Sequence, residues 1–301
     1  MSQTKQVIGR LEDICRANGW DVRFEIRPIV TKGDRILDVT LSKVGGKGLF
    51  VKEIEQAILG GEIDFAVHSL KDLPAELPEG LTIGAVPKRE DPRDCLVTRD
   101  GQGLARLPRG AVVGTSSLRR AAQLKAFRPD LDIRWIRGNV DTRLRRLEEG
   151  EFAAIVLAAA GLIRLGWQER IVECLPEDLC IPAVGQGALA IECRRGDGEL
   201  KELLARIHDP ETDAAVRAER SFLHRLNGGC HIPIGAHAKP TAEGAVRLIG
   251  MVGDPDGKEI IRDVLEDRDP VRAGIRLAES LIRQGAGRIL EQAEELEQAE
   301  E

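Results

Sequence analysis

The chain has 301 residues, of which 42% are hydrophobic and 31% are charged. This length predicts two or three domains and excludes a small scaffold stapled by disulfides. The composition excludes wholesale disorder, and no apolar run approaches the roughly 18 residues that a membrane span requires. The N-terminus shows neither the apolar core nor the cleavage site of a signal peptide. We therefore expect a cytoplasmic protein with no membrane partner.

The charge of the chain is unevenly distributed. The formal net charge is -6, which argues against general nucleic-acid binding. Residues 101 to 150, however, contain eleven Arg and Lys against five Asp and Glu, a local charge of +6 that predicts an anionic ligand there. The six cysteines lack the CxxC spacing of a zinc site, so we expect no metal and mostly reduced core thiols: Cys15, Cys95, Cys174, Cys180, Cys193 and Cys230.

Helical and strand patterns alternate through most of the chain. The segment Pro92–Leu107, rich in Pro, Arg, Asp and Gly, is interpreted as a crossing between domains. Such alternation predicts α/β domains whose parallel sheets hold ligands at the carboxyl ends of the strands. The expected helices are Val7–Cys15, Phe50–Leu59, Ser117–Phe127 and Thr142–Glu149, and the expected extended segments are Val22–Pro28, Ile63–Val67, Ala111–Val113, Ile133–Ile136 and Ala153–Leu157.

The pattern changes towards the C-terminus. Ala188–Glu192 predicts one more strand, followed by helices at Gly198–His208 and Thr212–Leu226, the second of which should end at the glycines after Asn227. Turn residues then separate three segments typical of antiparallel strands, Ile232–Ala238, Val246–Val252 and Glu259–Leu265, which predict an α+β unit. The acidic tail carries no predicted function.

Two polar residues follow the buried strand that ends near Val67. Lys71 and Asp72 would lie at its carboxyl end, where α/β sheets place ligands. An Asp in this position is often only a turn or cap residue. The functional alternative is a carboxylate that protonates a leaving group or stabilises a developing cation, and the pattern leaves both open.

The segment Gly114–Arg120 joins a short strand to a helix. It places backbone N–H groups, the hydroxyls of Thr115 and Ser117, and the guanidinium groups of Arg119 and Arg120 at a helix N-terminus, which favours an anion site. The alternative is that Ser117 merely caps the helix while both arginines lie on its solvated face. Arg137 and Arg143 repeat the theme at a second strand-to-helix junction, so the ligand should carry several carboxylates or phosphates.

Two loops rich in glycine stand out. The segment Ser42–Phe50, with three glycines, Lys43 and Lys47, fits a mobile lid, a phosphate-binding loop or an ordinary surface loop, but lacks the order of a P-loop. The segment Gly228–Gly235 places Cys230 on a loop, and the pattern leaves four roles open for it. It could be a nucleophile, a metal ligand with His231 and His237, a covalent anchor for a prosthetic group, or a structural thiol.

In these segments the sequence resembles the porphobilinogen deaminases, also called hydroxymethylbilane synthases. The matching motifs occur in the family's order and extend over all but the ends of the chain. They are Lys43–Glu55, Val67–Pro74, Arg89–Asp94, Val113–Arg120, Arg137–Arg143, Leu157–Gly166, Pro182–Cys193 and Gly228–Ala236.

The resemblance implies a transferase of tetrapyrrole and heme biosynthesis. Such enzymes join four porphobilinogens head to tail with release of ammonia, and then hydrolyse the product to linear hydroxymethylbilane. The chain grows on a dipyrromethane cofactor that is bound by a thioether to a cysteine, here Cys230. The acetate and propionate groups of the pyrroles would account for the basic segment.

The resemblance also implies roles for individual residues and a monomer of three domains. Asp72 would be catalytic, assisting ammonia loss and stabilising the cationic azafulvene. The cofactor would be held by Lys71, Thr115, Ser117, Arg119, Arg120 and Gln186, the substrate by Arg137, Arg143 and Arg164, and the lid would present Lys43, Lys47 and Phe50.

The implied architecture is two α/β domains similar to periplasmic binding proteins, with a cleft between them, and a small C-terminal α+β domain. Domain 1 would comprise residues 1–92 and about 188–206, domain 2 residues 93–187, and domain 3 residues 207–301. Family members begin with a strand that ends in a functional Arg and Ser, and this sequence starts after it. We therefore expect impaired activity and stability unless that strand is restored.

Two competing functions remain at this point. A non-catalytic receptor for carboxylates or oxyanions also fits two α/β lobes with an Arg-lined cleft, but would have no use for a covalently loaded Cys230. RNA binding through residues 101 to 150 is weaker, because only Phe127 and Trp135 interrupt the basic residues and single-strand binders need stacking platforms.

Overall fold

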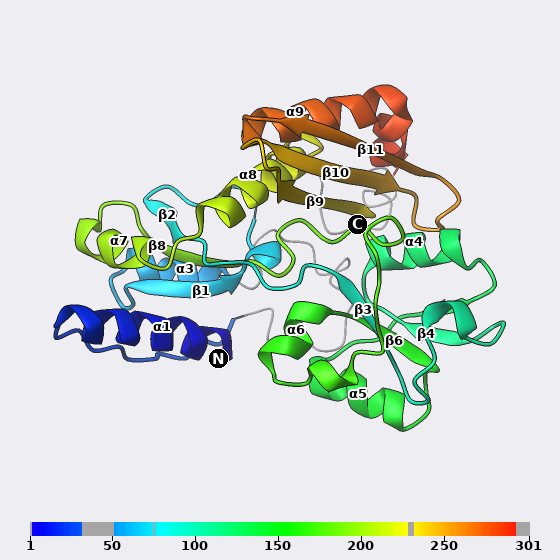
Figure 1. Ribbon diagram of the computed structural model, residues 1–301, viewed down its shortest axis with the longest axis horizontal. Coiled ribbons are helices and arrows are strands. Elements are labelled where there is room, and N and C mark those ends of the chain that lie inside the picture. The colour runs from blue at the N-terminus through cyan, green and yellow to red at the C-terminus, as the bar shows by residue number, and fades with distance from the viewer. Residues whose placement is uncertain (1, 32–50, 75, 228–231, 293–301) are drawn as a thin grey trace. The chain divides into compact units, whose positions relative to one another are not determined.

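The computed structural model describes residues 2–31, 51–74, 76–227 and 232–292. The chain forms two compact units (Figure 1). Unit 1 comprises Met1–Glu90 and Ala188–Asp213, and unit 2 comprises Asp91–Gly187 and Ala214–Glu301. The predicted lid residues Lys43, Lys47 and Phe50, and the predicted anchor Cys230, lie outside the described residues. Within the described ranges, no helix is both long and apolar enough to cross a membrane.

Unit 1 contains a three-stranded sheet with helices. Its strands lie in the order β1-β8-β2, and both pairs are antiparallel, so the parallel sheet predicted for this part of the chain is wrong among the described residues. β8 comes from a part of the chain far beyond β2 and lies between β1 and β2, both of which run opposite to it. The elements are α1 (Ser2–Asn18), α3 (Lys52–Leu59), β1 (Phe65–Ser69), the 3-10 turn η2 (Leu70–Asp72), β2 (Leu81–Ala85), β8 (Leu189–Arg194) and α7 (Gly198–Ala205).

The predicted helical spacing of α1 is confirmed by its packing. Val7, Leu11 and Cys15 are buried on one face and join Leu189 and Ile191 of β8 in the core of unit 1. Residues at this spacing lie above one another on a helix, so a single apolar stripe suffices to attach α1. The segment Val22–Pro28, predicted as extended, is irregular.

The first part of unit 2 is built on a mixed five-stranded sheet in the order β5-β4-β6-β3-β7. β4 pairs in parallel with β5 and β6, as predicted, whereas β3 pairs antiparallel with β6 and β7. The elements are β3 (Asp94–Thr98), η3 (Leu104–Arg106), β4 (Val112–Gly114), α4 (Leu118–Phe127), β5 (Asp132–Arg134), α5 (Val140–Glu148), β6 (Ala154–Ala158), α6 (Ala159–Arg164), η4 (Gln168–Arg170) and β7 (Glu173–Cys174).

The interpretation of Pro92–Leu107 as a crossing between domains overlooked a strand. All five residues of β3 are buried, and it lies between β6 and β7 in the sheet. The apolar run from Cys95 to Val97 is short, and the flanking Pro, Arg and Asp dominate the composition. Neighbouring strands from elsewhere in the chain, rather than local propensity, make this segment a strand.

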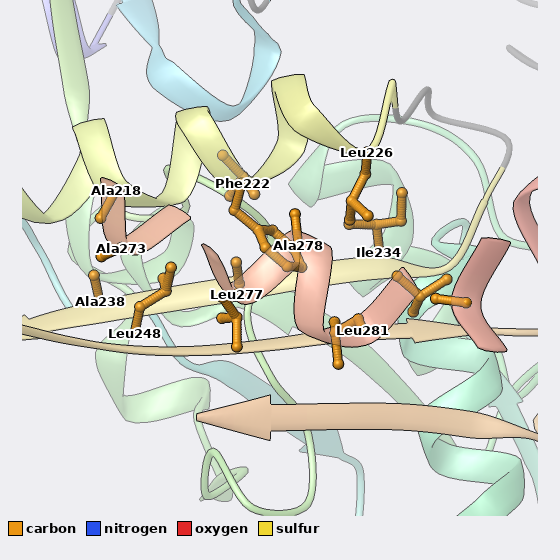
Figure 2. Close-up of a cluster of buried hydrophobic side chains, with 14 of the residues drawn as sticks. Ala218, Phe222, Leu226, Ile234, Ala238, Leu248, Ala273, Leu277, Ala278 and Leu281 are labelled. Carbon is orange, nitrogen blue, oxygen red and sulfur yellow. The ribbon is translucent and has the colours of Figure 1, made fainter. Parts of the chain in front are cut away.

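The second part of unit 2 confirms the predicted antiparallel strands. They form a sheet in the order β11-β10-β9. The elements are α8 (Pro210–Arg225), β9 (Ile234–Pro240), β10 (Val246–Gly253), β11 (Ile260–Asp267), α9 (Pro270–Leu281) and the π-helical turn η5 (Ile282–Ala286). Figure 2 shows buried side chains of α8, α9 and the strands meeting in one apolar cluster, with Phe222, Leu248 and Leu281 fully buried.

Candidate active site

Asp72 lies where the sequence places it, directly after β1. It ends the 3-10 turn η2, which is anchored by the buried Leu70, whose N–H donates to the carbonyl of Ala188 at 3.0 Å. The Asp72 side chain itself is exposed. A rigid, buried stem thus presents a carboxylate at the carboxyl end of a strand.

The surroundings of Asp72 favour its protonated form. Although the Asp72 side chain keeps access to solvent, protein atoms packed around its carboxyl partly desolvate it and raise its pKa above the ordinary 3.8, while the positive charges of Lys71 and His68 act in the opposite direction. Desolvation disfavours a charge, so a carboxyl in this setting can hold a proton and give it up at a higher pH than usual. This is the property required of a general acid.

A buried polar cluster that the sequence did not reveal lies in the same unit. His68 of β1 approaches Glu192 of β8, with 2.9 Å between Nε2 and Oε2, and both side chains are almost fully buried. Burial, followed by the charge of Glu192, raises the pKa of the Glu55 carboxyl. The only sequence signal is that Glu192 interrupts an apolar strand, which marks a buried polar group that needs a partner.

Arg119 and Arg120 are buried rather than solvated, which excludes the solvated-face alternative. Both contact Asp94, the first residue of β3. Arg119 Nη1 lies 2.6 Å from Asp94 Oδ2, and Arg120 Nε lies 2.7 Å from Oδ1. Arg119 also donates to the carbonyl of Ile181 at 2.6 Å, and Arg120 to that of Val156 at 3.1 Å.

Asp94 is therefore an ionised carboxylate inside the protein. Burial alone would raise its pKa, but the charges of Arg119 and Arg120 outweigh that effect and hold the pKa well below its usual range. Gln186 completes the group: its amide donates to Asp94 Oδ1 at 2.9 Å and to the carbonyl of Pro92 at 2.7 Å. Two guanidinium charges share one carboxylate, so this group keeps a net positive charge.

The hydroxyl groups of the same segment hold the backbone. Ser117 is the N-cap of α4 and accepts a hydrogen bond from the N–H of Arg120 at 3.4 Å, so the capping alternative is confirmed as one of its tasks. Thr115 is buried, and its hydroxyl accepts from the N–H of Ser117 at 3.2 Å. These contacts fix the turn that leads into the buried arginine pair.

The second strand-to-helix junction adds further positive charge. Asn139 caps α5 by accepting from the N–H of Thr142 at 2.9 Å. On the first turn of that helix, burial and the charges of Arg120 and Arg137 lower the pKa of Arg143 to about 10. Such a depression reflects loss of solvent around the guanidinium and the proximity of two other cationic side chains. An arginine remains protonated under these conditions, so the crowding favours a bound carboxylate or phosphate.

Two further predicted residues have defined contacts. Arg164, at the end of α6, donates to the carbonyl of Gly187 at 2.6 Å, next to Gln186. His237, considered above as a metal ligand, is buried on β9 with its Nδ1 2.9 Å from Glu177 Oε1. In unit 2 the structure thus groups Thr115, Ser117, Arg119, Arg120, Gln186, Arg137, Arg143 and Arg164 around the junctions of β4, β5 and β6, whereas Lys71 and Asp72 belong to unit 1.

Comparison with known proteins decides the family. Residues 1–202 match the model of "Porphobilinogen deaminase, dipyromethane cofactor binding domain", and residues 214–283 match that of "Porphobilinogen deaminase, C-terminal domain". The chain belongs to the porphobilinogen deaminase family. The porphobilinogen deaminase of Brevibacillus brevis is 57% identical over 290 residues, which cover 96% of this chain and 93% of the relative. That of Halalkalibacterium halodurans is 56% identical over 293 residues, or 97% of this chain and 93% of the relative.

Solved structures of other families show a distant likeness to this porphobilinogen deaminase family member. A periplasmic solute-binding protein from Desulfovibrio salexigens aligns with a TM-score of 0.41 and 12% identity, covering 69% of this chain and 68% of that chain. An extracellular amino-acid-binding protein from Bacillus subtilis gives a TM-score of 0.37 at 11% identity, covering 68% and 79%. Likenesses this weak have no bearing on function.

The Asp94 cluster predicts a specific response to acid. Because the pKa of Asp94 is lowered in the folded protein, an unfolded chain takes up a proton first as the pH falls below 3.8. The stability that Asp94 contributes is complete above that pH and is lost progressively below it. Asp94→Asn should lower the melting temperature near neutral pH, by the equivalent of about 3–5 kcal/mol, and should flatten its acid dependence.

The control is Asp132→Asn, which removes an exposed partner of Arg134 and should cost at most about 1 kcal/mol. The measurement is the melting temperature of parent and both variants from neutral pH to about pH 3. Equal losses in the two variants would contradict the assigned role of Asp94.

Proposed function

We propose that this protein is a porphobilinogen deaminase that condenses four porphobilinogens head to tail, releases ammonia and hydrolyses the product to hydroxymethylbilane. The observation that carries this proposal is the match of residues 1–202 and 214–283 to the two domains of that family. Porphobilinogen is the substrate of the family, and the activity is that of a transferase in tetrapyrrole biosynthesis. A non-catalytic receptor is not favoured, since the matched domain is named for its cofactor.

The protein uses a dipyrromethane cofactor, and Cys230 is proposed as its covalent attachment point. When bound, the cofactor supplies the pyrrole carbon to which the first substrate is joined. The residues present fit such a group, because a cofactor with several carboxylates would relieve the crowding of positive charge around Arg143. Thr115, Ser117, Gln186, Lys71 and the Arg119–Arg120 pair are proposed to hold its polar edges.

For the buried arginines the proposal is more limited than the sequence suggested. Asp94 already accepts hydrogen bonds from both guanidinium groups. The carbonyl of Ile181 accepts a further one from Arg119, and that of Val156 a further one from Arg120. The pair offers a ligand the positive charge that Asp94 does not compensate, together with the fixed turn of Thr115 and Ser117 that leads into it. Arg137, Arg143 and Arg164 are proposed to take the carboxylates of the incoming substrate and of the growing chain.

Asp72 is proposed as the catalytic carboxyl. Its raised pKa allows it to protonate the amino group as ammonia leaves. The carboxylate that remains then stabilises the cationic pyrrole until the next carbon–carbon bond forms. One side chain thereby serves two successive steps with opposite charge requirements.

The remaining expectations concern organisation. We propose three domains with the predicted boundaries at residues 92, 187 and 206, a lid formed by Lys43, Lys47 and Phe50, and a cytoplasmic monomer that binds neither nucleic acid nor membranes. Residues 91–187 and the C-terminal part of unit 2 have their own buried cores, with Val184 alone of the former in the core of the latter, which supports the division between the second and third domains.

Intact-mass spectrometry tests the covalent cofactor. The parent protein should be heavier than its sequence by two porphobilinogens minus two ammonias, and Cys230→Ser should lack this increment. Cys174→Ser, at a half-buried thiol on β7, is the matched control and should keep it. An unmodified parent that is folded would overturn the proposed function in favour of a receptor.

Substitution of Asp72 tests the catalytic assignment. Asp72→Asn should lower kcat about 10²- to 10⁴-fold, because the amide can neither give up a proton nor stabilise a cation. In the parent, kcat/KM should fall as the pH rises through the pKa of Asp72, which lies above the ordinary 3.8 of an aspartate, because the protonated carboxyl is the form that acts as the acid. Asp64, just before β1, is an exposed acid that pairs with Arg194. Asp64→Asn should change neither kcat nor the pH dependence of kcat/KM.

Two arginines of the same helix separate substrate binding from general charge. Arg143→Gln should raise KM for porphobilinogen about tenfold to a hundredfold, the loss expected for one charge-assisted hydrogen bond. Arg145→Gln removes an equal charge from α5, but Arg145 is exposed and lies 3.8 Å from Glu149, so KM should stay unchanged. Steady-state kinetics at constant ionic strength checks both, and equal effects would mean that only net charge matters.

A further inference from the structure

Glu219 is a fully buried carboxylate in the middle of α8. Its two oxygens accept hydrogen bonds from two separate segments. The N–H of Gly185 donates to Oε2 at 2.7 Å, and the N–H of Ala238 on β9 donates to Oε1 at 2.8 Å. An ionised carboxylate is the side chain best suited to accept two such bonds, because both of its oxygens are acceptors. Glu219 thus joins a helix, a turn and a strand within unit 2.

The turn that Glu219 holds carries a predicted cofactor residue. Gly185 and Gly187 have φ angles of +71° and +83°, a conformation that favours glycine, and the N–H of Gln186 between them donates to the carbonyl of Ala183 at 2.9 Å. Val184 packs into the apolar cluster with Phe222. The turn is therefore fixed on both sides of Gln186, whose amide reaches Asp94.

The strand that Glu219 holds lies against the buried arginine group. The N–H of Ala236 donates to the carbonyl of Pro182 at 3.0 Å. At Gly235 a Cβ would stand 3.0 Å from Arg119 Cδ and from the carbonyl oxygens of Ile181 and Pro182, so a side chain there would crowd these atoms. β9 is thus hydrogen-bonded to Pro182, and the carbonyl of the preceding Ile181 accepts a hydrogen bond from Arg119.

The same carboxylate also joins the two elements that flank Cys230. Along the chain, α8 ends at Arg225 and β9 begins at Ile234, and Cys230 falls between them. Figure 2 shows α8 and β9 sharing the apolar cluster through Leu226 and Ile234. Apolar packing resists separation of the two elements but tolerates small shifts along them, whereas two hydrogen bonds to one carboxylate fix the register.

We propose that Glu219 is a positioning residue for assembly of the cofactor: it sets the flanks of the Cys230 segment and the Gln186 turn in register with the Asp94–Arg119–Arg120 group. This inference rests on the proposed function, in which Cys230 receives the cofactor. Glu219 acts through the backbone of Gly185 and Ala238, so its contribution is to the rate at which a folded protein acquires the cofactor.

The test compares the rate of cofactor acquisition in variants of the full chain. Protein prepared without the cofactor is mixed with porphobilinogen, and the covalent mass increment is followed with time at a temperature well below unfolding. Glu219→Gln has nearly the same shape but replaces one acceptor by an amide donor that faces a backbone N–H. This variant should acquire the mass increment of the cofactor at least about tenfold more slowly than the parent.

Leu281→Ala is the matched control for loss of stability. Leu281, on α9, is fully buried in the same apolar cluster, and its side chain has no group that could form a hydrogen bond. This variant should melt at a lower temperature and still acquire the cofactor at the parent's rate. If Glu219→Gln matches the parent, or if both variants slow in proportion to their loss of melting temperature, Glu219 is only structural and the inference is overturned.

A second variant covers the case in which Glu219→Gln does not fold. Glu219→Asp keeps the charge and both acceptors but withdraws them from the backbone donors, and it should also slow acquisition. A rate equal to the parent's would overturn the inference. Failure of the proposed function is distinguishable, because the parent itself would then gain no increment, and this would overturn the inference with it.

Discussion

A single ionised carboxylate organises the basic part of this protein. Asp94 lies at the start of β3 with no exposed surface, and two guanidinium groups and one amide converge on it. An isolated charge at this depth would be very costly, and so would either arginine without its partner. Because two guanidinium groups face one carboxylate, the charge of Asp94 is fully compensated, but the group as a whole is not neutral. The positive charge left over is what a polycarboxylate ligand would meet.

The same balance recurs around it at lower burial. Burial and the positive charges of Arg120 and Arg137 lower the pKa of Arg143, whereas Arg134 and Arg146 in the same stretch of chain pair with Asp132 and Glu151. The positive charge of residues 101 to 150 is thus partly neutralised by nearby acids, as at Arg134, and partly crowded, as around Arg143.

The features that the sequence predicted are local ones. The cap Ser117 acts within three residues of its partner, and the apolar stripe of α1 needs only the helical period. The burial of Arg119 could not be predicted, because its partner Asp94 is 25 positions away. The His68–Glu192 pair spans 124 positions, and β8 inserts between β1 and β2 by the same kind of distant contact. Polar groups that satisfy one another across such distances leave no periodic pattern. The strand ends marked Asp72 and the arginines as candidates, and the family resemblance added Arg164 and Gln186.

The insertion of β8 also bears on the order in which the protein acquires its structure during synthesis. The first ninety residues cannot complete their sheet on the ribosome, because its central strand, Leu189–Arg194, is made only after the whole of Asp91–Gly187. That intervening stretch contains every strand of its own five-stranded sheet and can close it as soon as it emerges. The usual sequence of events, in which the N-terminal part folds first, is therefore inverted. Until residue 194 has been translated, β1 and β2 lack the strand that pairs with both of them, and strand edges exposed in this way are prone to association with other chains.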